Sequence, residues 1–215
     1  MPSGEHNLPA VPRLHLITPD RCDDATAAVT ARLLAGGAPL VQVRCKQATD
    51  RQRLQAVRAA LEARRAPDQL VLVDDRADVA CAAGADGVHV GDEDLPVPAV
   101  RSLVGHHRLV GATARTPEAA RARVLEGAHY LGVGPVREST TKVAGLPAPI
   151  GLDGLAAVAA AVPVPVIAIA GIEVGDVADV RAAGAHGVAV CAAVYGADDP
   201  PDALAAFLDA LGAAR

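Results

Sequence analysis

Carboxylate side chains follow two neighbouring apolar segments within residues 71–94, VLVDDRADVACAAGADGVHVGDED. The first segment ends in Asp74 and Asp75, and the second leads into a run of acids that ends at Asp94. The alanine-rich stretch between them predicts a strand–helix–strand unit, whose parallel strands have their carboxyl ends at one edge of a sheet. Runs of acids are more often solvated loops, but acids at two neighbouring strand ends can converge as the oxygen ligands that Mg²⁺ prefers. Asp75 and Asp94 are therefore the candidate metal ligands.

An amide and two cations follow the preceding predicted strand. Gln42 and Arg44 are two residues apart and share one face of that strand, and Lys46 continues the row beyond its end. Directing these groups into one site is unfavourable unless an anion binds there; the alternative is that Arg44 and Lys46 lie on a solvated loop. By the same alternation, the adjacent residues Asp74 and Asp75 should point to opposite faces unless the strand end twists.

Later predicted strands also end in groups that can bind an anion. These are Thr113 and Arg115, the hydroxyl-rich loop RESTTK at residues 137–142, the turn at Gly171, and the backbone amides near Cys191 and Ala192. Backbone amides after the last two strands of an eight-stranded barrel commonly bind phosphate, although a glycine such as Gly171 can equally mark a simple tight turn. His89 is most simply a hydrogen-bonded interior histidine, and the sequence does not say which face it uses.

The elements that must position these residues alternate along the chain. Apolar segments predict eight strands, at residues 14–18, 40–44, 69–75, 87–90, 108–113, 130–134, 164–170 and 188–191. Helical spacing follows each of them, at residues 20–37, 48–64, 77–83, 98–105, from 116 onwards, 152–161, 176–183 and 201–211. This alternation predicts an α/β fold, a (β/α)₈ TIM barrel; a doubly wound open sheet is the alternative, and the count of eight favours closure. We expect one barrel domain over residues 13–215 after a flexible N-terminal arm, residues 1–12.

Composition argues against several classes of function. Aromatic residues are 1% of the chain and its net charge is −5, so neither base stacking nor a basic surface for nucleic acid or membrane is expected. No apolar run approaches the length of a membrane span, and the polar N-terminus does not resemble a signal peptide. We therefore expect small-molecule partners and a reducing, cytoplasmic setting. A homo-oligomer is possible, because a helix-covered barrel can associate through surfaces that the sequence does not identify.

The four cysteines suggest no special chemistry. Cys22, Cys45, Cys81 and Cys191 show neither paired metal-ligand spacing nor a disulfide framework. Cys81 and Cys191 lie in apolar stretches, so we expect both to be small core residues.

The chain resembles the thiamine phosphate synthase family in the order and spacing of six groups of motifs. They are QVRCK (42–46), DDR with GVHVGDEDLP (74–76 and 87–96), LGVGPV (131–136), STTK (139–142), AIAGI (168–172) and GAHGVAV (184–190). The resemblance extends over residues 14–193. It implies a TIM-barrel transferase that uses Mg²⁺, joins a pyrimidine carried on a pyrophosphate ester to a thiazole phosphate, and releases pyrophosphate.

The resemblance also implies a role for each matching residue. Asp75 and Asp94 would bind Mg²⁺, and Arg44, Lys46 and Lys142 would bind the pyrophosphate. Gln42 would orient the pyrimidine, with Asp74 and Thr113 also at the substrate. The thiazole phosphate would contact Ser139, Thr141, Gly171 and the amides near Cys191 and Ala192.

Several positions depart from the family's pattern. The family usually has Asn at Asp74, Ser at Thr113, His at Arg115, an aromatic residue and Pro at Arg137 and Glu138, and Ser at Ala192. A carboxylate at Asp74 should repel pyrophosphate unless it is protonated or binds metal, and Arg115 and Arg137 are candidates to offset its charge. The alternatives are a thiazole tautomerase-like isomerase, a related barrel that uses another heterocycle, and a barrel that only binds a phosphorylated ligand. Retention of Lys46, Asp75, Asp94 and Lys142 argues against the isomerase, which needs no clamp for pyrophosphate.

Overall fold

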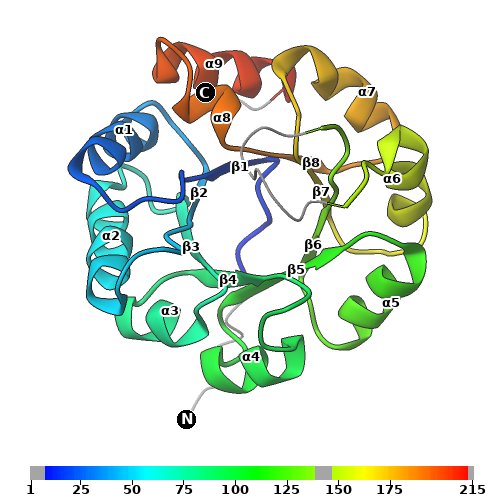
Figure 1. Ribbon diagram of the computed structural model, residues 1–215, viewed down its shortest axis with the longest axis horizontal. Coiled ribbons are helices and arrows are strands. Elements are labelled where there is room, and N and C mark those ends of the chain that lie inside the picture. The colour runs from blue at the N-terminus through cyan, green and yellow to red at the C-terminus, as the bar shows by residue number, and fades with distance from the viewer. Residues whose placement is uncertain (1–7, 139–146, 213–215) are drawn as a thin grey trace.

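Eight parallel strands close into a barrel in the computed structural model, which describes residues 8–138 and 147–212 (Figure 1). The strands are β1 (Leu14–Ile17), β2 (Leu40–Val43), β3 (Leu70–Asp74), β4 (Gly87–Val90), β5 (Leu109–Ala114), β6 (Tyr130–Val133), β7 (Val166–Ile169) and β8 (Gly187–Val190). Each strand pairs with the next in the sequence, and β8 pairs with β1. The predicted barrel is confirmed, and the open sheet is excluded.

Helices form a ring outside the strands (Figure 1). They are α1 (Asp24–Ala35), α2 (Asp50–Ala63), α3 (Ala77–Ala83), α4 (Val97–Val104), α5 (Pro117–Leu125), α6 (Gly151–Ala159), α7 (Val177–Ala182) with the 3₁₀ turn η1 (Val174–Asp176) before it, α8 (Ala192–Tyr195) and α9 (Pro200–Ala210). The helix α8 was not predicted, because four residues are too few to show a helical period. No helix within residues 8–138 and 147–212 combines the length and the apolar character that crossing a membrane requires.

The core has two layers, because side chains alternate between the two faces of each strand. One layer fills the space between the barrel and the helices and consists mainly of Val, Leu and Ala. The other fills the barrel interior with the buried side chains of Leu40, Leu72, Leu109, Tyr130 and Ile167, among others. Strands buried on both faces need apolar residues throughout, which explains their continuous hydrophobic runs.

The segment before β1 packs against the interior layer of the barrel, at the end where the strands begin. Leu8 and Val11, both in the segment expected to be a flexible arm, pack against the interior layer. The Pro12 carbonyl accepts a hydrogen bond from His15 Nε2 at 3.1 Å, and the Val11 carbonyl lies 2.9 Å from Nε2 of His186. Residues 1–7 of the expected arm lie outside the described part of the chain, so the arm as a whole stays a prediction.

His15 is buried as a neutral ring. Its side chain is 1% exposed and meets the edge of the Tyr130 ring at a centroid distance of 5.0 Å. Burial, followed by repulsion from His89, lowers the pKa of His15 from 6.5 to about 3. Below pH 6.5 the unfolded chain therefore binds a proton that the folded chain does not bind, and acidification must weaken folding.

We predict that His15→Gln, which keeps a donor near the Pro12 carbonyl, reduces this acid sensitivity. As the pH falls from 6.5 to 5, the wild type should lose about 1–2 kcal/mol more of its unfolding free energy than the variant. Urea unfolding at several pH values measures the difference, and the exposed His106→Gln serves as control. Parallel profiles for wild type and His15→Gln would contradict the prediction.

Candidate active site

Three side chains from β2 and the loop after it converge on the carboxylate of Asp74, at the end of β3. Gln42 Nε2 donates a hydrogen bond to Asp74 Oδ1 at 2.5 Å. Arg44 Nε and Lys46 Nζ lie 3.6 Å and 3.9 Å from Asp74 Oδ2. The parallel register, in which Val43 pairs with Val73, brings these strand ends together. The structure thus gathers Gln42, Arg44 and Lys46 on one side of the barrel mouth.

The Asp74 carboxyl is largely enclosed, with 9% of its side chain exposed. Burial, followed by repulsion from Asp75, raises its pKa to about 7, against the opposing pull of Lys46 and Arg44. Asp74 can therefore carry a proton near neutral pH, when it presents a hydroxyl donor and a carbonyl acceptor in place of a full charge.

Asp75 and Asp94 face each other across the ends of β3 and β4. Burial, and then a hydrogen bond with the Asp75 side chain, raises the pKa of Asp94. The Gly91 amide donates to Asp94 Oδ2 at 2.7 Å, and Lys46 Nζ lies 2.9 Å from Asp75 Oδ2. Asp74 and Asp75 do not point to opposite faces, because the strand end turns, which is the exception that the alternation allowed: β3 ends at Asp74, and Asp75 has a positive φ of 62°. That turn directs both carboxylates towards Lys46.

This pair of carboxylates suits Mg²⁺ by the chemistry of its donors. Asp75 and Asp94 come from neighbouring strand ends and act on each other electrostatically, so a cation bound between them would have an oxygen ligand from each side. Mg²⁺ typically takes one or two protein carboxylates and completes its shell with waters and substrate phosphate oxygens. In the part of the chain that the structure describes, no group of three or more His, Cys, Asp or Glu side chains could hold a metal ion by itself.

A neutral hydrogen-bonded group lies beside the charged cluster and inside the barrel. His89 Nδ1 lies 3.1 Å from the Tyr130 hydroxyl, and its Nε2 lies 3.2 Å from Thr113 Oγ1. Burial lowers the pKa of His89 to about 4, so its ring is neutral at pH 7. Tyr130 was not predicted as part of this group. Its sequence signal is a glycine on each of β5 and β6, because a Cβ at Gly111 would overlap the Tyr130 ring and one at Gly132 would lie 2.9 Å from His89 Cε1.

Two arginines expected to offset the charge of Asp74 lie elsewhere. Arg115 Nη1 binds Asp92 at 2.9 Å, and Arg137 Nη2 binds Asp176 at 2.7 Å. Each arginine pairs with the acid that its own loop meets, and Arg44 and Lys46 already neutralise Asp74 from the neighbouring strand. The proposed compensation by Arg115 and Arg137 was therefore wrong.

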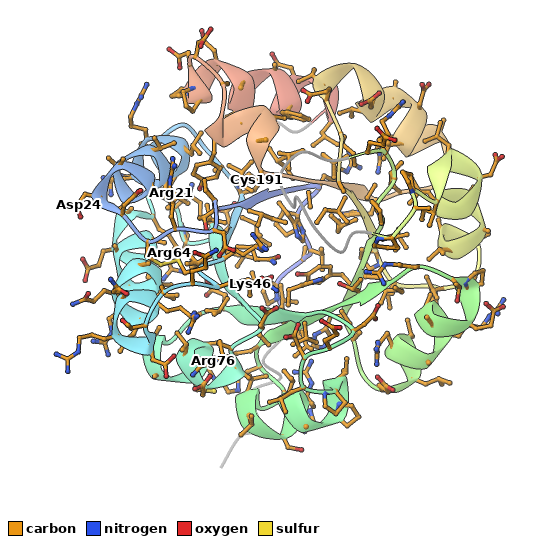
Figure 2. The ribbon with its side chains drawn as sticks, viewed as in Figure 1. Arg21, Asp24, Lys46, Arg64, Arg76 and Cys191 are labelled. Carbon is orange, nitrogen blue, oxygen red and sulfur yellow. A yellow bond between two sulfur atoms is a disulfide. The ribbon has the colours of Figure 1, made fainter. Side chains whose placement is uncertain are left out.

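The opposite side of the mouth is formed by the ends of β7 and β8. Ala170 and Gly171 both have positive φ, 76° and 67°, and a Cβ on Gly171 would overlap the Glu138 carbonyl oxygen. Cys191 immediately precedes α8, and Figure 2 shows it within the outline of the barrel, as it does Lys46. Burial raises the pKa of the Cys191 thiol. The predicted phosphate ligands Ser139, Thr141 and Lys142 lie outside the described residues, whereas Gly171, Cys191 and Ala192 lie on this side of the mouth.

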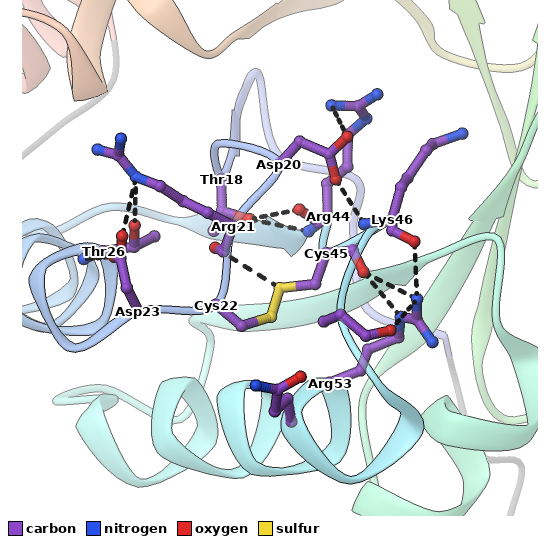
Figure 3. The surroundings of a disulfide bond; sticks show 12 residues. Thr18, Asp20, Arg21, Cys22, Asp23, Thr26, Arg44, Cys45, Lys46 and Arg53 are labelled. Atoms are coloured by element: carbon purple, nitrogen blue, oxygen red, sulfur yellow. Dashed lines mark hydrogen bonds and ion pairs between the residues drawn. A yellow bond between two sulfur atoms is a disulfide. The ribbon is translucent and has the colours of Figure 1, made fainter.

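A disulfide between Cys22 and Cys45 ties the loop after β1 to the loop after β2 (Figure 3). The expectation of no disulfide was wrong: the two cysteines are 23 residues apart in the sequence, and the parallel pairing of β1 with β2 brings the loops after these strands together, with Cα atoms 5.9 Å apart. The same two loops are joined by hydrogen bonds from the Arg44 amide to Thr18 Oγ1 at 2.8 Å and from the Lys46 amide to Asp20 Oδ1 at 2.5 Å. Cys81 and Cys191 are free thiols that are partly buried at the edge of the core, where Cys81 packs against the outer layer and Cys191 against the interior layer.

Known proteins match this chain along most of its length. A family model described as thiamine monophosphate synthase matches residues 14–194. The thiamine-phosphate synthase of Salinispora arenicola is 52% identical over 202 residues, covering 93% of this chain and 97% of that protein. That of Anaeromyxobacter dehalogenans is 52% identical over 184 residues, covering 85% of this chain and 81% of that protein. Among solved structures, thiamine phosphate pyrophosphorylase from Pyrococcus furiosus is similar with a TM-score of 0.81 at 33% identity, covering 93% of this chain and 95% of that one.

The disulfide predicts the number of reactive thiols. Unfolded, unreduced protein should react with a thiol reagent at Cys81 and Cys191 only, and at all four cysteines after reduction. Reduction should also lower the unfolding free energy by about 3 kcal/mol, because the cross-link no longer restricts the unfolded chain. Cys22→Ser should expose the Cys45 thiol without a reductant. Four reactive thiols in the unreduced wild type would contradict the pairing.

Proposed function

The chain belongs to the thiamine monophosphate synthase family, and from this premise we propose which of its residues do the chemistry. The protein is a transferase that joins a pyrimidine-methyl pyrophosphate to a thiazole phosphate, forming thiamine phosphate and releasing pyrophosphate. In this reaction the bond between the pyrimidine methylene carbon and the pyrophosphate oxygen breaks, and the bond to the thiazole nitrogen forms. The observation that carries our assignment is the convergence of Arg44, Lys46, Asp75 and Asp94 at one side of the mouth.

Departure of the pyrophosphate is the step that these charges favour. The leaving group takes the electron pair of the broken bond, and Arg44 and Lys46 would stabilise the negative charge that develops on it. Bound Mg²⁺, held by Asp75 and Asp94, would neutralise further charge on the same group. Lys142, which lies outside the described residues, would be the third cation of the assignment.

The organic part of the substrate would lie over the neutral floor of the barrel. Gln42, held by Asp74, would orient the pyrimidine, and Thr113 is held by a neutral His89. The pyrimidine cation left behind is then captured by the thiazole nitrogen, so the protein needs to position the two molecules and needs no nucleophile of its own. Ser139, Thr141, Gly171 and the amides near Cys191 and Ala192 would bind the thiazole phosphate.

Asp74 takes the place of an amide in this scheme. Its raised pKa supports a protonated carboxyl, which offers a donor and an acceptor much as asparagine does and does not repel pyrophosphate. A tautomerase-like isomerase would have no use for the cations and acids gathered beside it. We therefore keep the transferase with the ordinary pair of substrates.

We also propose that the enzyme works in the cytoplasm on small phosphorylated molecules, without a nucleic-acid or membrane partner. A net charge of −5 and the near absence of aromatic residues argue against a nucleic-acid or membrane partner. Disulfides are uncommon in reducing compartments. The number of free thiols in protein isolated under alkylating conditions therefore tests the cytoplasmic location: four are expected in a reducing compartment, and two if Cys22 and Cys45 are joined in the cell.

Pyrophosphate release from the two substrates, with and without Mg²⁺, tests the function. We expect release that depends on both substrates and on the metal. Asp94→Asn should lower kcat/KM by about a hundredfold through loss of a metal ligand, while the unfolding free energy changes by less than about 1 kcal/mol at this accessible site. Asp92→Asn, an acid on the same loop that pairs with Arg115 and Arg123, is the matched control and should keep full activity. No release, with binding of thiazole phosphate alone, would favour the isomerase or the binding protein.

Asp74→Asn should preserve or raise kcat/KM, because the amide keeps a partner for Gln42 and cannot ionise next to the pyrophosphate at any pH. Steady-state kinetics with both substrates measures it. Asp74→Ala removes the partner of Gln42 altogether and should lower kcat/KM by about tenfold. If Asp74→Asn instead abolishes turnover, Asp74 binds the metal in its own right.

A further inference from the structure

Arg53 is a buried cation beneath the loop that follows β2. It lies in the first turn of α2, it is 7% exposed, and it donates four hydrogen bonds to backbone carbonyls of this loop (Figure 3). Nε and Nη2 bind the Cys45 carbonyl at 3.2 Å and 2.8 Å, and Nη2 also lies 3.3 Å from the Lys46 carbonyl and 3.2 Å from that of Ala48. The loop therefore folds around the guanidinium.

This loop carries the cations assigned to the pyrophosphate. Arg44 and Lys46 flank Cys45, so the carbonyl groups that Arg53 binds belong to the backbone from which the Lys46 side chain projects. The hydrogen bonds to Thr18 and Asp20 hold the loop from the side of β1, and Arg53 holds it from the side of α2. Without Arg53, the carbonyl groups of Lys46 and Ala48 would lose a donor, and that of Cys45 would keep only the Ala48 amide at 3.2 Å, so the loop would have to move to find others.

A chain of charged contacts extends from Arg53 to the loop after β3. Arg53 Nη1 donates to Asp50 Oδ1 at 2.9 Å, and the same oxygen accepts from Arg76 Nη1 at 2.5 Å. Arg76 directly follows Asp75 and also binds Asp78 with two hydrogen bonds, at 2.9 Å and 2.6 Å. The backbone that presents Lys46 and the backbone that presents Asp75 are thus braced against each other outside the site, while the two side chains meet inside it.

We propose that Arg53 is a positioning residue for pyrophosphate binding, which acts by holding the loop at residues 45–48 and, through Asp50 and Arg76, by setting Lys46 against Asp75. The proposal rests on the proposed function of Lys46. Arg53 itself contacts no substrate. Its loss should weaken binding of the pyrophosphate group and leave the thiazole phosphate, on the other side of the mouth, unaffected.

A lysine cannot replace Arg53 in this role. Arginine presents five N–H donors in a rigid planar fork, whereas lysine has one ammonium group at the end of a flexible chain. Arg53→Lys keeps the charge but cannot satisfy three carbonyls and Asp50 at once. The variant therefore separates the geometry of the side chain from its charge.

The experiment compares Arg53→Lys with the wild type in steady-state kinetics and in calorimetric binding of inorganic pyrophosphate with Mg²⁺. All proteins are reduced with dithiothreitol, because the Cys22–Cys45 disulfide ties the same loop. We expect the KM for the pyrimidine pyrophosphate and the Kd for inorganic pyrophosphate to rise about tenfold or more, and the KM for thiazole phosphate to stay within about twofold.

The matched control is Arg101→Lys. Arg101, on α4, also donates to three backbone carbonyls, those of Gly105, Arg108 and Gly127, but these lie in the segments that lead into β5 and β6, at the opposite end of the barrel. The Arg101→Lys variant should have a lower melting temperature, with unchanged KM values for the pyrimidine pyrophosphate and for thiazole phosphate. If Arg101→Lys raised the KM for the pyrimidine pyrophosphate as much as Arg53→Lys does, the effect would be one of general destabilisation. That result would overturn the inference.

Asp50→Asn decides the question should Arg53→Lys fail to fold. The Asp50 side chain is 69% exposed, and the change weakens the link between Arg53 and Arg76 without burying a new group. We expect the KM for the pyrimidine pyrophosphate alone to rise about threefold.

The outcomes for the two proposals are distinct. Unchanged binding of inorganic pyrophosphate in Arg53→Lys or, if that variant does not fold, in Asp50→Asn overturns the inference. A wild type that binds pyrophosphate but releases none from the substrates contradicts the proposed function, and the Arg53 comparison then still stands on binding. A wild type that neither binds inorganic pyrophosphate nor releases it from the substrates overturns both.

Discussion

Acids and cations lie side by side at the carboxyl ends of β2 and β3, and the arrangement of the candidate site depends on the balance between their charges. Asp74 is almost enclosed, and an enclosed carboxylate is stable only with donors and cations close to it, or with a proton. Gln42, Arg44 and Lys46 supply the donors from the neighbouring strand. Arg44 and Lys46 are also the cations that would bind a pyrophosphate. Their contacts with the acids therefore hold them in position for the substrate.

The loops around this cluster are held by contacts that have no part in the chemistry. The Cys22–Cys45 disulfide and hydrogen bonds to Thr18 and Asp20 join the loop after β1 to the loop after β2. Arg53, from α2, binds the backbone of the loop after β2. Such rigidity is needed because flexible cations would lose conformational entropy on each binding event. The interior beneath is neutral by contrast, with His15, His89 and Tyr130 enclosed and uncharged at pH 7.

The departures from the family's usual residues can be understood one at a time. Asp74 adds an acid where an amide is usual. Burial raises the pKa of this acid to about 7, which favours the uncharged form. Arg115 and Arg137 do not take part, because each is paired with an acid of the outer rim. The extra carboxyl is therefore accommodated by residues that the site already contained, and the family's reaction needs no new partner.

What the sequence determined by itself was the architecture, and with it the end of the barrel at which the candidate residues of β2, β3 and β4 gather. Strand and helix periods, glycine stops and the count of eight units report local preferences, and closure of parallel strands then sends Gln42, Lys46, Asp75 and Asp94 to one rim. Only the tertiary structure decided how these groups pair. The turn at Asp75, the union of Cys22 with Cys45, the Tyr130 contact of His89 and the hold of Arg53 on its loop all join residues through space or through one unusual dihedral angle. Neither kind of contact leaves a periodic trace along the chain, because the distance between two side chains in a closed barrel is set by neighbouring strands and not by spacing in sequence.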